Sequence, residues 1–309
     1  MNTDYKCVTT VDGIRDYIGG SRIVAFDFET APDDPYREEE KAALDPAKAH
    51  IAGCSFSVKA GTGIYVPVAH RVGTNIDKDA FLTFLTAFLL NKTITKIAHN
   101  IAFESGMAYA RGIAIQAPVY DTICASQMSL KSRYEFRKLS ESGLKRLAEE
   151  LFGEPLPSFS SVTAGKHFDE LDAQDEETVR YGSADSDFAL RLYYKFNEWF
   201  DRYLPKHRYI VEEIESPTAV YLGIMKCNGI PVNLPLMQER KTEAEAEMER
   251  IRGEIEFIIG DVNIGANCST QAFKNYLYKD LGLPILKTTE TNREAADDMT
   301  MTLLKEWCD

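Results

Sequence analysis

Short apolar runs alternate with stretches of helical spacing from the N-terminus to about residue 204. Runs rich in β-branched and aromatic residues predict strands, and apolar residues at helical intervals behind a capping residue predict helices. Strands come first and are then interspersed with helices, so the pattern predicts an α/β domain with helices packed on a mixed sheet. The predicted strands are 23–29, 51–58, 63–68 and 94–98, and the predicted helices are 77–90, one from Asn100, one from Asp121, and 177–200.

The pattern changes from Pro205 onward, where helical spacing continues with few strand signals. Helices are predicted at 206–228, 234–259 and 270–281, and Pro231 and Pro235 separate the first from the second. Charged residues dominate 239–256, which predicts a long, exposed helix. We therefore expect two domains, 1–204 and 205–309.

Composition favours a globular protein of the cytoplasm. Hydrophobic residues make up 44% and charged residues 27% of the chain. The longest apolar run, 81–90, is too short to span a bilayer, and no secretion signal begins the chain. The six cysteines are scattered without a Cys-x-x-Cys pair, which favours reduced thiols over disulfides or a zinc site. No membrane partner is expected.

The net charge of −13 argues against a nucleic-acid partner, because phosphate attraction usually requires a basic surface. An enzyme that holds metal ions on carboxylates nevertheless needs local acidity and can bind DNA through a small basic patch. One stretch, opposed only by Glu135 and Glu141, could form such a patch or an ordinary solvated helix face. Its basic residues are Lys131, Arg133, Arg137, Lys138, Lys145 and Arg146.

Two pairs of residues could carry chemistry. Asp27 and Glu29 are two apart in a predicted strand and therefore point to the same face, where a divalent cation would relieve their repulsion. The alternative is a strand whose outer face becomes polar at its end. Tyr181 and Asp185 are four apart in a predicted helix and share one face. The alternative is an ordinary pair on a solvated helix, where this spacing is common. Asp187 is expected to be a surface charge.

Between these pairs lies the segment 99–104. We expect Asn100 to cap a helix, Phe103 to be buried, and Glu104 to lie in the first turn, where the helix dipole favours an anion. Capping alone explains Asn100 and Glu104. It does not explain why an acid occurs between the other two pairs.

The combination is more specific than its parts. Asp27, Glu29, Glu104 and Asp185, with Tyr181, would form a site for two Mg²⁺ ions roughly 4 Å apart. Such a site clamps a phosphodiester: one metal lowers the pKa of a water, and the other stabilises the leaving 3′ oxygen.

In these segments the sequence resembles the proofreading 3′→5′ exonuclease domain of family A DNA polymerases of the bacterial polymerase I type. Residues 24–30, 99–104 and 181–185 resemble its three motifs, the last in the tyrosine-containing form. Residues 51–70 resemble the strands that follow the first motif, and Asp121 matches a structural cap. Residues 225–232 and 263–289 resemble the start of the family's thumb.

The resemblance implies a ribonuclease H-like α/β fold, with a mixed sheet flanked by helices, over residues 1–204. Residues 205–309 would be a helical, partial thumb without palm and fingers, so no polymerase activity is expected from this chain. It also implies roles for the site residues. Asp27 would bridge both metals, Glu29 and Asp185 would complete the site of one, Glu104 would support the other, and Tyr181 would position the attacking water.

The implied substrate is a single-stranded or frayed 3′ end of DNA, and the products are nucleoside 5′-monophosphates. Mg²⁺ would be the cofactor, with Mn²⁺ able to substitute, and the protein would act as a monomer in a bacterial or phage-infected cell. Phe28 and the stretch 156–159 are candidates for stacking on bases, with burial in the core the alternative for Phe28. The expected DNA-binding residues are Asn100, Lys131, Arg133, Arg137 and Lys138.

One residue departs from the family pattern, which usually has aspartate where this chain has Glu104. The extra methylene displaces the carboxylate by about one carbon–carbon bond, and catalytic geometry is sensitive at about 1 Å. A non-catalytic DNA-binding module with an impaired site is therefore one alternative to a DNA exonuclease. A ribonuclease D-like RNA-trimming enzyme, which shares the same carboxylate set, is the other.

Overall fold

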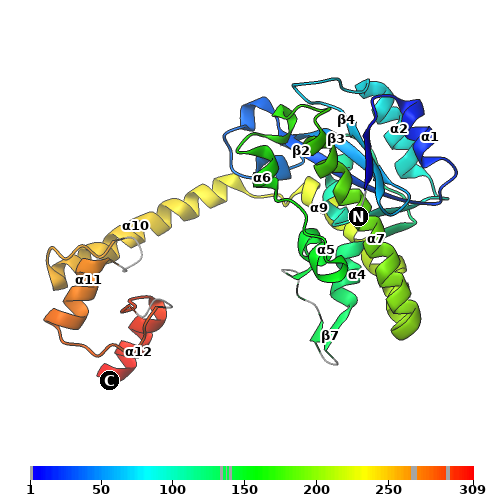
Figure 1. The fold of residues 1–309 in the computed structure, drawn as a ribbon. Helices are drawn as coiled ribbons and strands as arrows, with labels where there is room; N and C mark the ends of the chain where they lie inside the picture. Colours follow the sequence, from blue (N-terminus) through cyan, green and yellow to red (C-terminus); the bar gives the residue numbers. More distant parts are fainter. Residues whose placement is uncertain (1–2, 133–134, 137, 139–140, 266–269, 290–292) are drawn as a thin grey trace. The chain divides into compact units, whose positions relative to one another are not determined.

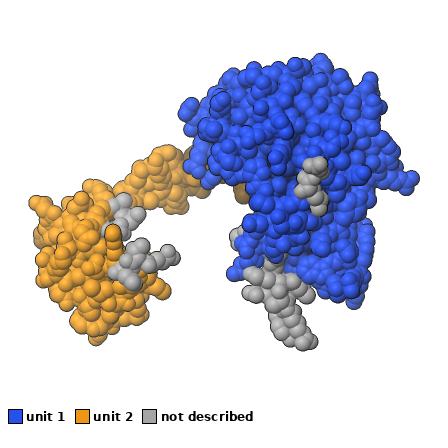
Figure 2. Space-filling model, in the orientation of Figure 1, with its two compact units in different colours: residues 1–229 blue, residues 230–309 orange. Residues whose placement is uncertain are grey.

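The computed structural model describes residues 3–132, 135–136, 138, 141–265, 270–289 and 293–309. The chain divides into two compact units, residues 1–229 and residues 230–309 (Figure 2). The candidate site residues lie in the first unit.

A six-stranded mixed sheet forms the centre of the first unit (Figure 1). The three parallel pairs are β1–β4, β2–β5 and β5–β6, while β3 runs antiparallel to both β2 and β4. This arrangement confirms the predicted α/β class with a mixed sheet. In spatial order the strands are β1 (Asp4–Cys7), β4 (Thr62–Pro67), β3 (Ala49–Ser57), β2 (Ile23–Pro32), β5 (Thr95–Ala98) and β6 (Val119–Asp121).

Helices cover both faces of this sheet. One apolar cluster joins α1, α2, α3 and α9 to the sheet, and another joins α4, α5 and α7 to it. The helices of the unit are α1 (Val11–Ile18), α2 (Lys78–Leu90), α3 (Ile101–Tyr109), α4 (Thr122–Met128), α5 (Leu144–Phe152), α6 (Phe159–Thr163), α7 (Glu176–Tyr203), α8 (Pro205–Ile210) and α9 (Ser216–Asn228). Shorter elements are η1 (Asp34–Tyr36), η2 (Ala42–Leu44), η4 (Phe168–Glu170), the π-helical turn η5 (Val211–Glu215), and the hairpin strands β7 (Leu130–Ser132) and β8 (Glu135–Phe136).

The alternation of side chains along β2 decides which face carries acids. Val24, Phe26 and Phe28 belong to the cluster under α2 and α3. The residues between them face the opposite side, because successive side chains of a strand point to opposite faces. Asp27 and Glu29 therefore lie on the face that α7 covers.

The ring of Tyr65 on β4 sets how closely α7 approaches the sheet. A Cβ atom added at Gly53 on β3 would lie 1.8 Å from the Tyr65 hydroxyl oxygen, and one added at Gly182 on α7 would lie 2.5 Å from its ring. Both glycines are thus needed for the ring to fit between strand and helix. The Tyr65 hydroxyl is held by Nε2 of His70 at 2.6 Å. This close approach brings the next turn of α7, with Asp185, over β2.

The first unit extends to residue 229, beyond the domain boundary near residue 204 that the sequence predicted. Helix α9 packs on α3, where Ser105 Oγ donates to the Val220 carbonyl at 2.7 Å. A Cβ atom at Gly223 would lie 2.1 Å from the carbonyl oxygen of Ala102, so the two helices are in backbone contact. Helical spacing cannot reveal which neighbour a helix chooses, and this contact places α9 with the α/β domain.

The second unit is helical, as predicted. None of the residues of α10 is buried, and the helix carries ion pairs such as Arg240–Glu243. Leu277 and Leu304 are among the buried apolar residues of this unit. The elements are α10 (Leu234–Ile259), α11 (Gln271–Asn275), the π-helical turn η6 (Tyr276–Asp280) and α12 (Asp298–Cys308). Among the described residues of the whole chain, no helix has both the length and the hydropathy that crossing a bilayer requires.

Replacing Gly182 with alanine should destabilise the first unit. The added methyl group would overlap the Tyr65 ring, and overpacking of this kind costs about 1–3 kcal/mol. Helix propensity acts in the opposite direction by about 1 kcal/mol. The free energy of unfolding can be measured by urea titration, following Trp199 fluorescence in a Trp307→Phe background.

The control is Gly20→Ala, in the turn after α1 of the same unit, where an added Cβ has no atom within 4 Å. This variant should be as stable as the parent or slightly more stable. Equal stability of Gly182→Ala and the parent would contradict the role given to the Tyr65 ring.

Candidate active site

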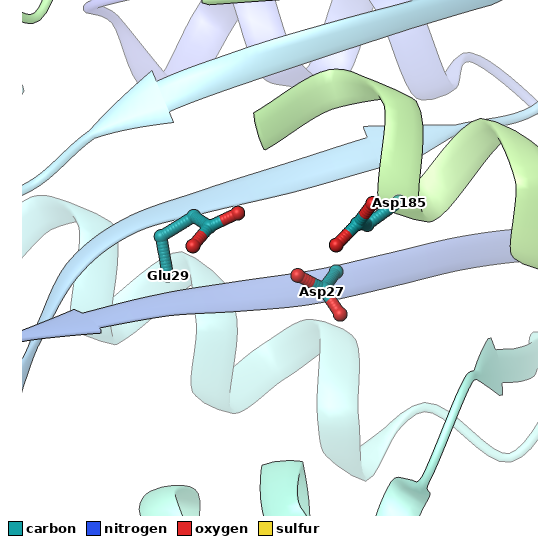
Figure 3. Close-up of side chains that lie close together, drawn as sticks. All are labelled: Asp27, Glu29 and Asp185. Atoms are coloured by element: carbon teal, nitrogen blue, oxygen red, sulfur yellow. The ribbon is translucent and has the colours of Figure 1, made fainter. Parts of the chain in front are cut away.

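Three carboxylates from two elements converge above the sheet (Figure 3). One carboxylate oxygen from each of Asp27, Glu29 and Asp185 lies within 4.8 Å of the others. Asp27 and Glu29 extend from β2, and Asp185 extends from α7 toward Asp27. Three acidic ligands at this spacing can hold a divalent cation, for which carboxylate oxygens are preferred ligands.

The electrostatics of this group require a counter-charge. Burial raises the pKa of Asp27, and the neighbouring Asp185 raises it further. Burial also raises the pKa of Glu29, with added contributions from Asp27 and Asp185. The buried Oε1 atom of Glu29 has no hydrogen-bond partner among the described residues. Mutually repelling carboxylates, one of which has an unpartnered buried oxygen, fit a cation as their missing partner.

Glu104 lies apart from this group but lines the same cavity. Its side chain, in the first turn of α3, is 1% exposed, and no described residue is hydrogen-bonded to its Oε2 atom. Burial raises its pKa well above the ordinary value, and the charge of Asp27 raises it further. Glu104 is thus close enough to Asp27 for the charge of Asp27 to raise its pKa, and its Oε2 atom has no hydrogen-bond partner among the described residues, so it fits a second ligand position beside the three-carboxylate group.

A cavity of about 550 Å³ opens over the carboxylates. Aromatic side chains also line the cavity, and Phe159, which is 45% exposed, stacks on the buried Phe168 at 6.4 Å between ring centroids. Phe28 contributes to the lining but is buried in the core, as the alternative for this residue predicted. Of the stretch 156–159, Phe159 reaches this cavity, whereas Leu156 lines a different one.

Tyr181 lies one turn before Asp185 on α7 and is buried. Its ring packs against Phe168 and Phe159. Burial raises the pKa of its hydroxyl, and the charges of Glu29 and Asp185 raise it further, so the hydroxyl keeps its proton. The hydroxyl oxygen accepts a hydrogen bond from Lys145 Nζ at 3.3 Å.

The capping role expected for the side chain of Asn100 belongs to Asp121. The backbone N–H groups of Asn100 and Ile101 donate to the Asp121 carboxylate at 3.0 and 2.9 Å, and Ile123 N–H donates to it at 2.8 Å. Asn100 is the first residue of the turn, but its side chain makes no capping hydrogen bond and is exposed. Its backbone is left-handed (φ 78°), a conformation that asparagine tolerates better than most residues. Asp121 therefore caps both α3 and α4, and Asn100 stays available to solvent.

The expectation that Asp187 is a surface charge is wrong. The side chain is fully buried and accepts hydrogen bonds from the Tyr5 hydroxyl at 2.7 Å and from Gly61 N–H at 2.8 Å. Arg191, one turn later on α7, forms an ion pair with it at 2.6 Å. Helical spacing correctly turned Asp187 away from Asp185, but β1 and the β3–β4 turn cover that side of α7. Asp187 thus anchors α7 to the edge of the sheet.

The predicted basic stretch is only partly covered by the structure. Arg133 and Arg137 lie outside the described residues. Lys131 lies in β7, and Lys138 is exposed. Lys145, counted in the same stretch, instead reaches the acidic site through Tyr181. The sequence offered no sign of this contact, nor of the aromatic wall formed by Phe168, because both depend on how α5 and η4 pack against α7.

Comparison with known proteins agrees with this geometry. A family model described as 3′-5′ exonuclease matches residues 6–200. DNA polymerase I of Pseudomonas aeruginosa is 25% identical over 297 residues, which cover 93% of this chain and 30% of that protein. The chain spans less than a third of the length of the DNA polymerases I that it matches.

Two solved structures share the fold. The POL domain of Pol1 from M. smegmatis, in complex with DNA primer-template and dNTP, has a TM-score of 0.66 at 14% identity and covers 98% of this chain and 45% of that one. Escherichia coli RNase D, an exoribonuclease involved in structured RNA processing, has a TM-score of 0.50 at 16% identity and covers 74% of this chain and 52% of that one. The ribonuclease H-like mixed sheet is thus confirmed.

The acidic site should make the metal-free protein less stable as pH rises. Burial raises the pKa of Asp185 to about 6, above its ordinary value of 3.8, while Lys145 partly lowers it. A carboxyl group whose folded pKa is raised stabilises the fold only while it is protonated, so this contribution disappears between about pH 4 and pH 6. In EDTA, Asp185→Asn should therefore gain on the order of 2 kcal/mol over the parent between those pH values.

Thermal unfolding of both proteins at pH 4 and pH 8 measures the difference. Adding Mn²⁺ at pH 8 should make the parent more stable than Asp185→Asn, because the parent has the full ligand set and metal binding stabilises the folded state. A difference between the two proteins that is the same at both pH values would contradict the raised pKa.

Proposed function

This chain belongs to the 3′–5′ exonuclease family of the family A DNA polymerases and is therefore a nuclease, and we propose that it is a metal-dependent proofreading enzyme that shortens DNA from its 3′ end. The observation that carries the proposal is the convergence of Asp27, Glu29 and Asp185 at the floor of an aromatic-walled cavity. Hydrolysis would release nucleoside 5′-monophosphates.

The residues present fit divalent metal ions. Asp27, Glu29 and Asp185 would hold one ion, and Asp27 with Glu104 would hold a second, since orphaned buried oxygens remain on Glu29 and Glu104. Bound Mg²⁺ or Mn²⁺ would activate a water molecule and neutralise charge on the scissile phosphate. The protein contributes the rigid, desolvated spacing of the carboxylates, which gives this chemistry its geometry.

The side chains around the carboxylates suggest how the strand end is held. Tyr181 keeps its proton and lies one turn from Asp185, where its hydroxyl would orient the attacking water. Phe159 is half-exposed and stacked on Phe168, so its free face would stack on a terminal base. Asn100, exposed at the start of α3, would contact the strand, with Lys131, Arg133, Arg137 and Lys138 as further DNA contacts.

DNA is the proposed substrate because the curated relatives are DNA polymerases. The likeness to RNase D concerns the fold alone. Residues 205–309 are proposed to begin the polymerase part of such a protein, in line with the alignment to DNA polymerase I over 93% of the chain. The chain is proposed to act as a monomer.

Digestion of 5′-labelled single-stranded DNA tests the proposal. In Mg²⁺ or Mn²⁺ the parent should shorten the strand stepwise, and EDTA should abolish the reaction. Asp27→Asn, which keeps the shape of the side chain but removes the charge shared by both metal positions, should be reduced to the background rate. Gel electrophoresis of the labelled products gives the ladder, and chromatography identifies the mononucleotides.

An RNA strand of the same sequence is the matched control. Equal or faster digestion of the RNA would favour the RNA-trimming alternative. If the parent shortens neither strand in either metal, the enzymatic proposal fails, and DNA binding without cleavage would support the non-catalytic alternative.

Glu104 can be tested separately because it lies outside the three-carboxylate group. Glu104→Gln keeps the length of the side chain and removes its charge, which weakens the second metal position. We expect a lower exonuclease rate and a higher Mg²⁺ concentration for half-maximal activity, measured by a Mg²⁺ titration of the rate. Digestion by Glu104→Ala at the parent's rate would show that this carboxylate is not needed.

A further inference from the structure

Lys145 is the one basic residue of the predicted basic stretch that is seen to contact a candidate active-site residue among the described residues. It is the second residue of α5, whose neighbouring residues Leu144, Leu147 and Ala148 are buried. Lys145 itself is half-buried. The apolar face of α5 therefore fixes the backbone of Lys145, and this fixed backbone determines where the ammonium group can reach.

The ammonium group of Lys145 meets Tyr181 in two ways. Nζ donates to the tyrosine hydroxyl at 3.3 Å and lies 4.8 Å from the centroid of the ring. Its charge also acts on the acids, lowering the pKa of Glu29 and of Asp185 against the larger effect of burial. A cation thus lies at the edge of the acidic site, on the same side as the tyrosine.

The direction of the hydrogen bond has a chemical consequence. A lysine ammonium group has donors only, so the Tyr181 oxygen must be the acceptor. With one lone pair engaged by Lys145 and its proton retained, the hydroxyl has that proton to donate toward the cavity. A water molecule that accepts a hydrogen bond from this hydroxyl has its orientation fixed, and its second lone pair is free to attack phosphorus.

We propose that Lys145 is a positioning residue for the nuclease reaction, which holds the Tyr181 hydroxyl as a donor and offsets part of the negative charge of Glu29 and Asp185. This inference rests on the proposed function. Lys145 acts through Tyr181 on the attacking water and through its charge on the affinity of the acids for divalent cations. It does not need to touch the substrate.

A double-variant cycle tests the first effect. Parent, Lys145→Met, Tyr181→Phe and the combined variant are compared for kcat and KM on 5′-labelled single-stranded DNA. Lys145→Met should lower kcat about tenfold, the size expected for one hydrogen bond, and leave KM unchanged. Because Lys145 acts through Tyr181, the combined variant should be no slower than Tyr181→Phe alone. Multiplying losses, or a change in KM alone, would overturn the proposal.

Mn²⁺ binding tests the second effect without any turnover. Removing a nearby positive charge should tighten binding, so Lys145→Met should have a lower Kd for Mn²⁺ by electron paramagnetic resonance than the parent. Lys195→Met, an exposed lysine on α7, is the control and should match the parent in both assays. An inactive parent would contradict the proposed function. The Mn²⁺ titration would then still test the proposed charge effect of Lys145, and an unchanged or higher Kd for Lys145→Met would overturn that effect.

Discussion

Repulsion among closely spaced carboxylates is the constraint on which the first unit depends. Asp27, Glu29 and Asp185 bring their oxygens within 4.8 Å of one another where burial disfavours their charged forms. Without a cation this arrangement opposes folding, so contacts elsewhere must hold β2 and α7 together. The rest of the unit can be understood as the scaffold that supplies these contacts.

The scaffold works by fixing one helix against one sheet. On one side of Asp185, Tyr65 fits between Gly53 and Gly182 and sets the separation of α7 from the sheet. On the other side, the buried Asp187 ties α7 to β1 and to the β3–β4 turn. Packing below the acid and polar anchoring beyond it leave α7 little freedom to relieve the repulsion by moving away. A divalent cation would thus enter a site whose geometry is already fixed by the contacts of α7 with the sheet.

A second set of contacts positions the outer wall of the site. Asp121 caps α3 and α4. Its own backbone N–H donates to Ser216 Oγ of α9 at 2.8 Å, so the start of the helix that carries Glu104 is tied to both α4 and α9. Glu104 therefore has a rigid base but a longer side chain than the family pattern. The cavity above it combines an acidic floor with aromatic rings, a combination suited to a phosphate and its attached base.

The sequence by itself determined the mixed α/β class, the strands β2, β3, β4 and β5, and the identities of the acids, because period-two and helical patterns depend on local packing against one apolar face. It also placed Asp27 and Glu29 on one face of β2. Tertiary structure alone decided that α9 joins the first unit, that Asp187 is buried, that Asp121 does the capping expected of Asn100, and that Lys145 meets Tyr181. Each of these depends on which distant segment covers a given side chain, and no local pattern records that choice.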